Sequence, residues 1–328
     1  MEQGNPGRGM RAFPAAVLLA GAALVLAAPA AAQSVAATVN GVIDGTLINP
    51  ADCAQTFAIG VTVSCTRTGP GGASFAGRAR VDDRGRLRGT SAAQHDGAGT
   101  VTLGTAGASW TDTARFGPFA TPVIGRIFIA MDGFQFATTD GDGSSLAAAT
   151  GSIMRLGVYR DGNQIDPAAF DEIQLDRSLL DYGTYQSHTL ATRQVVRGVS
   201  GPFLVDPVPA DRTRFNLFLA FEIEPGISSI QFFWNFATNS YINPGFTGSA
   251  QTFYFSTAAI TGFQFLDLDG ADITSRAGLS FDSGQDYPIG APPAGAIPEP
   301  ATWALMVAGF GLLGGALRRR RLPARAEG

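Results

Sequence analysis

Between its two ends the chain alternates apolar and polar residues far more often than it follows a helical period. Every second residue from Phe215 to Ile223 is apolar, and the same alternation recurs from Ile230 to Phe236. A period of two places these side chains on one face of a β-strand. Because only a short segment containing Pro225-Gly226 separates the two runs, the pattern predicts that they pair as a β-hairpin.

Short apolar runs interrupted by Gly, Asp, Asn and Pro fill most of the remaining chain. They predict further strands at Val35–Val42, Thr56–Ser64, Ser74–Val81, Val123–Phe136, Ile153–Arg160, Thr189–Val199, Thr252–Phe265 and Leu279–Phe281. Pro167–Leu180 is instead predicted to be a helix, since Asp166 suits an N-cap and Pro167 suits the first helical position. Many short strands with turns between them predict an all-β fold, an antiparallel β-sandwich that is jelly-roll-like.

The N-terminus has the layout of a secretory signal peptide. Arg8 and Arg11 precede an apolar stretch from Ala12 to Ala28, which Pro29-Ala30-Ala31-Ala32 follows. A basic region, a short apolar region and small residues at the cleavage site predict removal before Gln33. We therefore expect the protein to be exported.

Export changes the meaning of the two cysteines, Cys53 and Cys65. An even pair in an exported chain predicts a disulfide, because oxidising compartments preserve such bonds. Zinc would need two more ligands, and His95 and His188 lack the spacing from the cysteines that zinc sites show.

The C-terminus predicts a membrane segment. Residues 301–317 carry no charge and are followed by Arg318, Arg319, Arg320 and Arg321. A helix of this length spans about 25 Å, slightly less than the hydrocarbon core of about 30 Å. Trp303 suits one membrane interface, and the positive-inside bias keeps the arginines cytoplasmic. The body of the chain should therefore lie on the far side of the membrane.

The residues around this helix carry a recognisable motif. Pro298-Glu299-Pro300-Ala301-Thr302-Trp303-Ala304, the apolar helix and the arginine cluster together resemble the PEP-CTERM sorting signal in its PEPxxWA form. The resemblance covers only the tail. It implies recognition and cleavage at the Pro-Glu-Pro element by an exosortase-type membrane protease, with release or re-anchoring of the exported domain. It also implies a Gram-negative host that makes exopolysaccharide, and some ice-binding proteins carry the same tail.

The charge of the exported body argues against nucleic acid as a partner. Residues 33–290 contain 16 arginines and 24 acidic residues, a formal charge of −8, and the chain has no lysine. Affinity for nucleic acid comes largely from neutralising phosphates, which an acidic surface does not do.

Arginines nevertheless gather at one place, around Asp82-Asp83 and Gly85. A tight turn at the aspartates would crowd them onto the exposed face of one hairpin. Their guanidinium groups then suit the sulfate, uronate or phosphate groups of an anionic polysaccharide. The alternative is a solvated sheet edge whose charge prevents aggregation. We name these residues the arginine hairpin: Arg78, Arg80, Arg84, Arg86 and Arg88.

Aromatic residues cluster late in the body. They are Phe232, Phe233, Trp234, Phe236, Tyr241, Phe246, Phe253, Tyr254 and Phe255. Aromatics at alternate positions usually fill a core, although sugar-binding sandwiches present some of them to pyranose rings. Phe233 and Tyr254 lie on the opposite face from their neighbours and are the expected exposed members.

Two groups of acids suggest other chemistry. Asp267, Asp269 and Asp272 resemble part of a calcium loop, but the EF-hand pattern fails and turn chemistry explains them as well. Glu222 and Glu224 share one side of a strand, as a glycosidase pair would, and Glu172 is the other glutamate of the body. No nucleophile motif accompanies them.

We therefore expect a signal peptide at 1–32, an exported β-sandwich domain at 33–290 and a linker at 291–297. The sorting tail follows at 298–321, with its transmembrane helix at 301–317 and a short cytoplasmic end at 322–328. The expected protein is an inner-membrane-anchored precursor that becomes a non-enzymatic cell-envelope or biofilm-matrix protein, structural or exopolysaccharide-associated. It has no expected cofactor apart from the calcium candidate. The alternatives are a carbohydrate-binding or ice-binding module and a secreted glycoside hydrolase.

Overall fold

The computed structural model describes most of the body of the chain. The described residues are 34–43, 46–48, 53, 55–69, 72–82, 85–97, 102–160, 170–209 and 213–292. The predicted signal peptide and the predicted sorting tail with its helix lie outside them. Among the described residues, no helix has the length and apolar character needed to cross a membrane.

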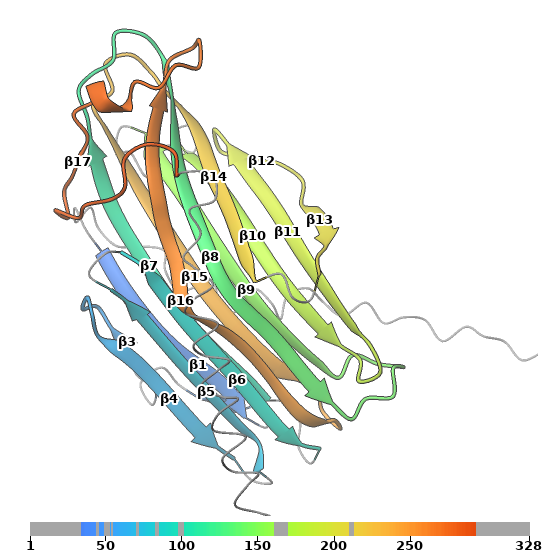
Figure 1. The fold of residues 1–328 in the computed structure, drawn as a ribbon. Coiled ribbons are helices and arrows are strands. Elements are labelled where there is room, and N and C mark those ends of the chain that lie inside the picture. Colours follow the sequence, from blue (N-terminus) through green and yellow to red (C-terminus); the bar gives the residue numbers. More distant parts are fainter. Residues whose placement is uncertain are drawn as a thin grey trace, which may run out of the picture. The chain divides into compact units, whose positions relative to one another are not determined.

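The described body is all β, with strands in two antiparallel sheets (Figure 1). The larger sheet has eleven strands, eight of them in the order β12-β11-β10-β9-β15-β7-β1-β2, while β13, β17 and β3 pair with β11, β7 and β1. Its strands are β1 (Ser34–Ile43), β2 (Thr46–Ile48), β3 (Gln55–Thr56), β7 (Thr102–Arg115), β9 (Ala148–Arg160), β10 (Phe170–Asp181), β11 (Gln186–Val196), β12 (Val199–Ser200), β13 (Leu204–Pro207), β15 (Ser229–Ile242) and β17 (Ser280–Phe281).

The smaller sheet has six strands in the order β14-β8-β16-β6-β5-β4. They are β4 (Thr62–Thr68), β5 (Ser74–Val81), β6 (Leu87–Asp96), β8 (Val123–Thr139), β14 (Arg214–Ile223) and β16 (Thr247–Leu266). A 3-10 helix, η3 (Thr274–Arg276), follows β16. All strand pairs of this sheet are antiparallel.

The two sheets pack on each other through their apolar faces. The main hydrophobic cluster combines Trp110 and Trp234 of the larger sheet with Leu87, Phe215 and Phe263 of the smaller one. All five side chains are almost fully buried. Burial of such large apolar groups is the main favourable term in folding, so the alternating pattern fixes which face of each strand turns inward. The prediction of an antiparallel, sandwich-like all-β fold is confirmed.

Most predicted strands form. The prediction for Ser74–Val81 matches β5, and those for Val35–Val42 and Val123–Phe136 match β1 and β8 within a few residues. The predicted strand at Thr56–Ser64 is wrong in its middle, because β3 ends at Thr56 and β4 begins at Thr62. Residues 57–61 are exposed, so no packing holds them in a sheet.

The predicted helix at Pro167–Leu180 is wrong. Its described part is β10, which pairs with β9 and β11 along its length. Leu175 and Leu179 turn toward the core, and the residues between them alternate with a period of two. The capping signal at Asp166-Pro167 favoured a helix locally, but sheet pairing on both sides outweighs local propensity.

The predicted hairpin between Phe215–Ile223 and Ile230–Phe236 is also wrong. Both segments are strands, but β14 pairs with β8 in the smaller sheet and β15 pairs with β7 and β9 in the larger. The turn at Pro225-Gly226 therefore carries the chain from one sheet to the other. Each segment has one apolar face, and crossing between sheets lets both faces enter the same core.

Candidate functional site

The arginine hairpin forms as a real hairpin, with β5 paired to β6. Arg80 lies directly opposite Arg88, and Arg78 lies opposite Thr90. The neighbouring pair Val81 and Leu87 is fully buried, so the arginine positions occupy the other face of the sheet. Arg84 lies outside the described residues.

One buried acid divides the arginines into two groups. Asp82 is 2% exposed and accepts hydrogen bonds from the Arg86 amide (3.0 Å) and the Arg86 Nε (2.6 Å). Arg88 Nη2 lies 3.4 Å from the same carboxylate. Among the described residues, no carboxylate lies within 4.0 Å of Arg78 or Arg80. These two arginines therefore add positive charge to the solvent face of the smaller sheet.

The sheet register places Arg78 in a row that crosses five strands. Phe134 of β8 lies opposite Phe253 of β16, Phe253 opposite Thr90 of β6, and Thr90 opposite Arg78 of β5. Ser64 of β4 completes the row opposite Arg78. These strands lie side by side in Figure 1. We call the five residues the cross-strand row.

Three phenylalanines at one end of this row form an exposed apolar strip. The Phe134 and Phe253 ring centroids are 5.2 Å apart, and those of Phe134 and Phe136 are 6.4 Å apart. The ring planes in each pair lie within 23° of parallel. Phe253 is 36% exposed and Phe136 is 38% exposed. We call Phe134, Phe136 and Phe253 the aromatic strip.

The expected exposure of Tyr254 is wrong. Tyr254 is fully buried, and its hydroxyl accepts a hydrogen bond from Arg177 Nη1 (3.0 Å). Burial raises the pKa of this hydroxyl, and the nearby Arg177 charge opposes that shift. Phe253, predicted as a core residue, is the exposed neighbour. Phe233 is half-buried and stacks on Phe170 with centroids 6.0 Å apart.

Phe134 and Phe136 were not predicted to be site residues from the sequence. The signal was present, because charged Arg126 shares their even-numbered face of β8, while its neighbour Ile127 is on the other face and is buried. A charged residue on one face of a strand marks the face that meets solvent.

A second aromatic pair lies farther along the same face. Phe128 and Phe218 have centroids 5.7 Å apart, and the Arg126 guanidinium lies 5.3 Å from the Phe218 centroid. Phe218 is 47% exposed. Phe128 and Phe134 are six residues apart on β8, or about 20 Å along an extended strand.

The other carboxylates are engaged in internal networks. Glu222 binds Arg197 Nη2 at 2.7 Å, and Glu224 lies 3.9 Å from the same nitrogen. Arg197 has a left-handed backbone (φ 48°), in the turn between β11 and β12. The predicted glycosidase pair therefore links this turn of the larger sheet to the end of β14.

Glu172 lies on the opposite face of the larger sheet from the core. Burial raises its pKa, the Arg155 and Arg193 charges oppose that shift, and Asp176 adds to it. Burial also raises the pKa of Asp176, which accepts two hydrogen bonds from Gln174 Nε2. Arg193 Nη2 in turn donates to Gln174 Oε1 (2.8 Å). The acids are thus held in a network of arginine and glutamine.

A groove of about 490 Å³ lies at the β11–β12–β13 edge. Its walls include Ile173, Val196, Val199, Pro202 and Leu204, and none of its described lining residues is an acid, histidine or cysteine. Neither Glu172 nor Glu222 lines it.

The calcium candidates serve as turn residues. Asp267 Oδ1 accepts the amides of Asp269 (3.1 Å) and Ala271 (2.8 Å). The Asp272 carboxylate accepts hydrogen bonds from Gln264 Nε2 and from the Thr274 amide, each at 2.9 Å, and hydrogen bonding lowers its pKa. Across the described part of the chain, no three acids, histidines or cysteines are grouped to hold a metal ion.

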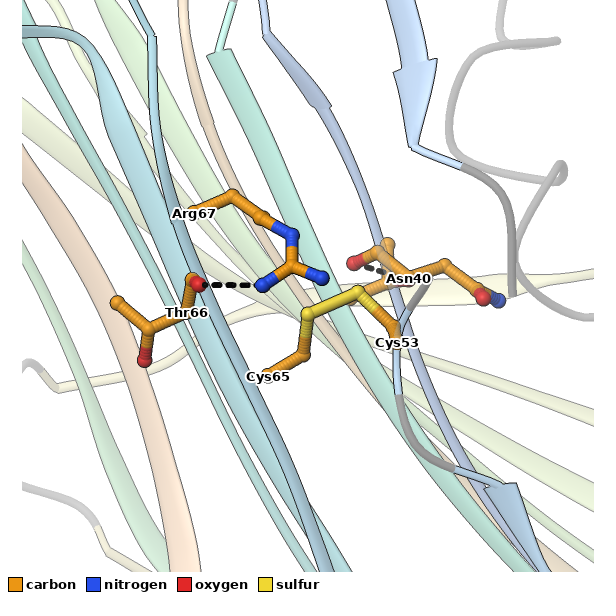
Figure 2. Close-up of a disulfide and its surroundings, with 6 residues drawn as sticks. Asn40, Cys53, Cys65, Thr66 and Arg67 are labelled. Carbon is orange, nitrogen blue, oxygen red and sulfur yellow. Dashed lines mark hydrogen bonds between the residues drawn. A yellow bond between two sulfur atoms is a disulfide. The ribbon is translucent and has the colours of Figure 1, made fainter. Parts of the chain in front are cut away.

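The predicted disulfide joins Cys53 to Cys65 (Figure 2). Both residues are buried in a smaller hydrophobic cluster with Val63 and Phe75. The bond ties the segment before β3 to β4, an edge strand of the smaller sheet.

Comparisons with known proteins identify only the tail. Among curated proteins, none matches this chain. One family model matches the C-terminal tail, and its description concerns protein sorting. Proteins that carry the matched motif are exported and sorted to the cell surface. The motif implies processing by an exosortase. Residues 296–321 of this chain are a PEP-CTERM protein-sorting motif.

Proposed function

We propose that this exported, exosortase-processed protein is a non-enzymatic component of the cell envelope or extracellular matrix that associates with acidic exopolysaccharide. The observation that carries the proposal is the pair Arg78 and Arg80 on the solvent face of the smaller sheet. Both lack an acidic partner among the described residues. Guanidinium groups bind carboxylates and sulfates through charge-assisted hydrogen bonds.

The overall charge of the body sharpens this argument. A surface with a formal charge of −8 repels polyanions except where positive charge is concentrated. Arg78 and Arg80 of the arginine hairpin provide that concentration on β5, which pairs with β4 on one side and β6 on the other. A polyanion would therefore contact this face in preference to the rest of the body.

The remaining parts of the proposal concern the route to the surface. The signal peptide at 1–32 starts export, and the helix at 301–317 with the stop at Arg318–Arg321 holds a precursor in the inner membrane. Exosortase acts at Pro298-Glu299-Pro300, with Trp303 as part of its recognition motif. The body at 33–290 is jelly-roll-like in its connections. The linker at 291–297 joins it to the tail, and residues 322–328 stay cytoplasmic.

The proposal is tested with protein that ends after Pro292, because both sheets and the two hydrophobic clusters described above lie before that residue. Binding to an acidic polysaccharide is measured at increasing salt. Wild type should bind saturably and more weakly as salt rises, because salt screens exposed charges. The double variant Arg78→Ala/Arg80→Ala should lose most of this binding.

Arg276→Ala is the matched control, since Arg276 is an exposed arginine away from the hairpin. It should bind as wild type does. If wild type fails to bind at low salt, or if all three proteins bind equally, the arginine hairpin does not recognise polyanions and the proposal is wrong.

A further inference from the structure

We propose that two copies of this chain associate through the edge at which the larger sheet extends beyond the smaller one. The larger sheet continues past β14 with β11, β12 and β13, which we call the sheet extension. The extension of each copy covers that of the other about a two-fold axis, so both copies contribute the same surface. The arginine hairpin lies toward the other end of the smaller sheet and takes no part.

Contacts between the sheets locate the extension. The Arg177 guanidinium of β10 lies 5.2 Å from the Phe215 centroid of β14, and the rings of Phe236 in β15 and Tyr254 in β16 are 5.2 Å apart. The order β14-β8-β16 therefore runs alongside β10-β9-β15. β14 ends the smaller sheet, whereas β11 continues the larger one beyond β10 and carries β12 and β13 on its far edge (Figure 1). No described strand of the smaller sheet covers these three strands.

The inner face of the extension is apolar and exposed. Leu190 of β11 packs against the main hydrophobic cluster, so the even-numbered residues of β11 face inward. Val199 pairs with Val196 and Leu204 pairs with Thr192, which places both on this face. The groove of about 490 Å³ lies here, because these four residues line it. Exposed apolar residues around a groove favour burial by a partner.

Strand directions favour a second copy as that partner. β13 runs in the direction of β10, since both are antiparallel to β11. Phe215 near the start of β14 lies at Arg177 of β10. Glu222 near the end of β14 bonds Arg197, whose amide donates to Asp171 near the start of β10. β14 therefore runs opposite to β13, the relation that antiparallel pairing needs.

A two-fold axis parallel to the strands satisfies both features. It keeps the strand directions and exchanges the layers, so β13 of the second copy lies beside the edge of β14 that is unpaired among the described residues. β11 of one copy then lies over β13 of the other. Pairing β14 with β14 of the second copy would instead place each extension where β10 of the other copy lies.

Charges are complementary in this arrangement. Asp206 of β13 is exposed and lies opposite Leu190, which lies opposite Arg177, so the three share the inner face and one level along the strands. Arg177 is 1% exposed, its Nε and Nη2 have no hydrogen-bond partner, and no described carboxylate lies within 4.0 Å of it. The axis preserves the level of each residue, so Asp206 of one copy faces the buried cation of the other. Such a charge offsets the cost of burying an unpaired cation.

The association has a consequence for polysaccharide binding. Exchange of the layers turns the smaller sheets of the two copies to opposite sides of the dimer. One dimer therefore presents two arginine hairpins and can join two polysaccharide chains. This consequence rests on the proposed function, whereas the association does not.

The experiment measures molecular mass by sedimentation equilibrium at increasing concentrations of the protein that ends after Pro292. Wild type should form a dimer. Leu204→Asp should weaken the dimer about hundredfold, because each dimer would then bury two unpaired carboxylates against apolar groups. Asp206→Arg should weaken it about tenfold, because it places a like charge opposite Arg177.

Val205→Asp is the matched control. Val205 is 61% exposed, against 62% for Leu204, and it lies on the outer face of β13 opposite Ala191. This variant should form the dimer as tightly as wild type does. Circular dichroism of all variants should show the same β structure, since each change lies at an exposed position.

A wild type that stays monomeric at every concentration overturns the proposal and leaves the extension to a strand of another protein. Equal weakening by Leu204→Asp and Val205→Asp also overturns it, because the contact would then not depend on the inner face. In either case Arg78→Ala/Arg80→Ala still tests the proposed function separately.

Discussion

Trp234 Nε1 donates a 3.1 Å hydrogen bond to the carbonyl oxygen of Gly85. Trp234 belongs to β15 of the larger sheet, whereas Gly85 lies in the turn between β5 and β6 of the smaller sheet. The turn is closed internally as well, because the Gly85 amide donates to the Asp82 carbonyl (3.1 Å). The arginine hairpin is therefore anchored to the core of the opposite sheet.

Gly85 should be hard to replace. Its φ is +65°, which L side chains rarely adopt, and an added Cβ would lie 3.2 Å from the Tyr287 hydroxyl and 3.4 Å from Trp110 Cε2. We expect Gly85→Ala to lower the free energy of unfolding by about 2 kcal/mol, measured by urea denaturation.

Gly226→Ala provides the control for Gly85. Gly226 has a similar φ of +87°, but nothing lies within 4 Å of its added Cβ. Gly226→Ala should lower the free energy of unfolding by about 1 kcal/mol, which is the backbone contribution alone. Equal losses in the two variants would show that packing around the hairpin turn contributes nothing.

The disulfide should stabilise the region around β4. Cys53 and Cys65 are 12 positions apart in the sequence, and closing such a loop in the unfolded chain is worth about 3 kcal/mol in the chain-entropy model. We expect Cys53→Ser/Cys65→Ser to lose about that amount in urea denaturation. Wild type unfolded in the presence of a reductant should match the variant. A variant as stable as oxidised wild type would contradict the expected role.

Asp112 should make stability depend on pH. Burial raises its pKa above 3.8, although hydrogen bonds from the Ser283 hydroxyl, the Thr113 and Ser283 amides and the Tyr287 hydroxyl favour the carboxylate. As pH rises above 3.8, the Asp112 carboxyl group loses its proton in the unfolded state before it does so in the folded state. The contribution of Asp112 to stability is therefore fully present below pH 3.8 and is lost as pH rises through the raised folded pKa.

Asp112→Asn tests this linkage by urea denaturation at several pH values. The variant cannot ionise at this position, so its stability relative to wild type should improve as pH rises from about 4 to 7. Glu172 and Asp176 have pKa values raised in the same direction, and those of Asp142 and Asp272 are lowered, but all four remain in both proteins. If the difference in free energy of unfolding between Asp112→Asn and wild type stayed constant with pH, it would contradict the expectation.

The sorting motif predicts a processing defect. Glu299→Ala/Pro300→Ala should leave an uncleaved protein in the membrane fraction, detected by mass and by fractionation of cells that contain the exosortase. Glu327→Ala, an acidic residue outside the matched motif, should be processed normally. Unchanged processing of the double variant would show that cleavage does not depend on Pro298-Glu299-Pro300.

Alternation in the sequence predicted individual strands well but not their partners. The apolar face of Phe215–Ile223 is turned inward as predicted, yet its neighbour β8 lies far away in the sequence. A short turn indicates nothing about whether the chain stays in one sheet or crosses to the other. The helix prediction at Pro167–Leu180 failed because capping residues act locally, while β10 is fixed by two long neighbouring strands.

The site was predictable only in part. The arginine hairpin followed from local spacing, because β5 and β6 are adjacent in sequence. Its neighbourhood did not, since Phe253 and Phe134 reach the row of Arg78 only through the order β8-β16-β6-β5. Phe253 and Tyr254 illustrate the same limit. Either the odd-numbered or the even-numbered residues of β16 could face an apolar core until the pairing with β6 is known.

The most direct test of the account is hydroxyl-radical footprinting of the protein with and without an acidic polysaccharide. Oxidation of Phe136 and Phe253 should fall in the presence of the ligand, while that of Phe218, which lies outside the row, and Phe203, which lies on the larger sheet's edge, should not change. Protection confined to the aromatic strip is the predicted result. Saturable binding without protection of Phe136 or Phe253, or with protection of Phe203 instead, would contradict a glycan site on the smaller sheet.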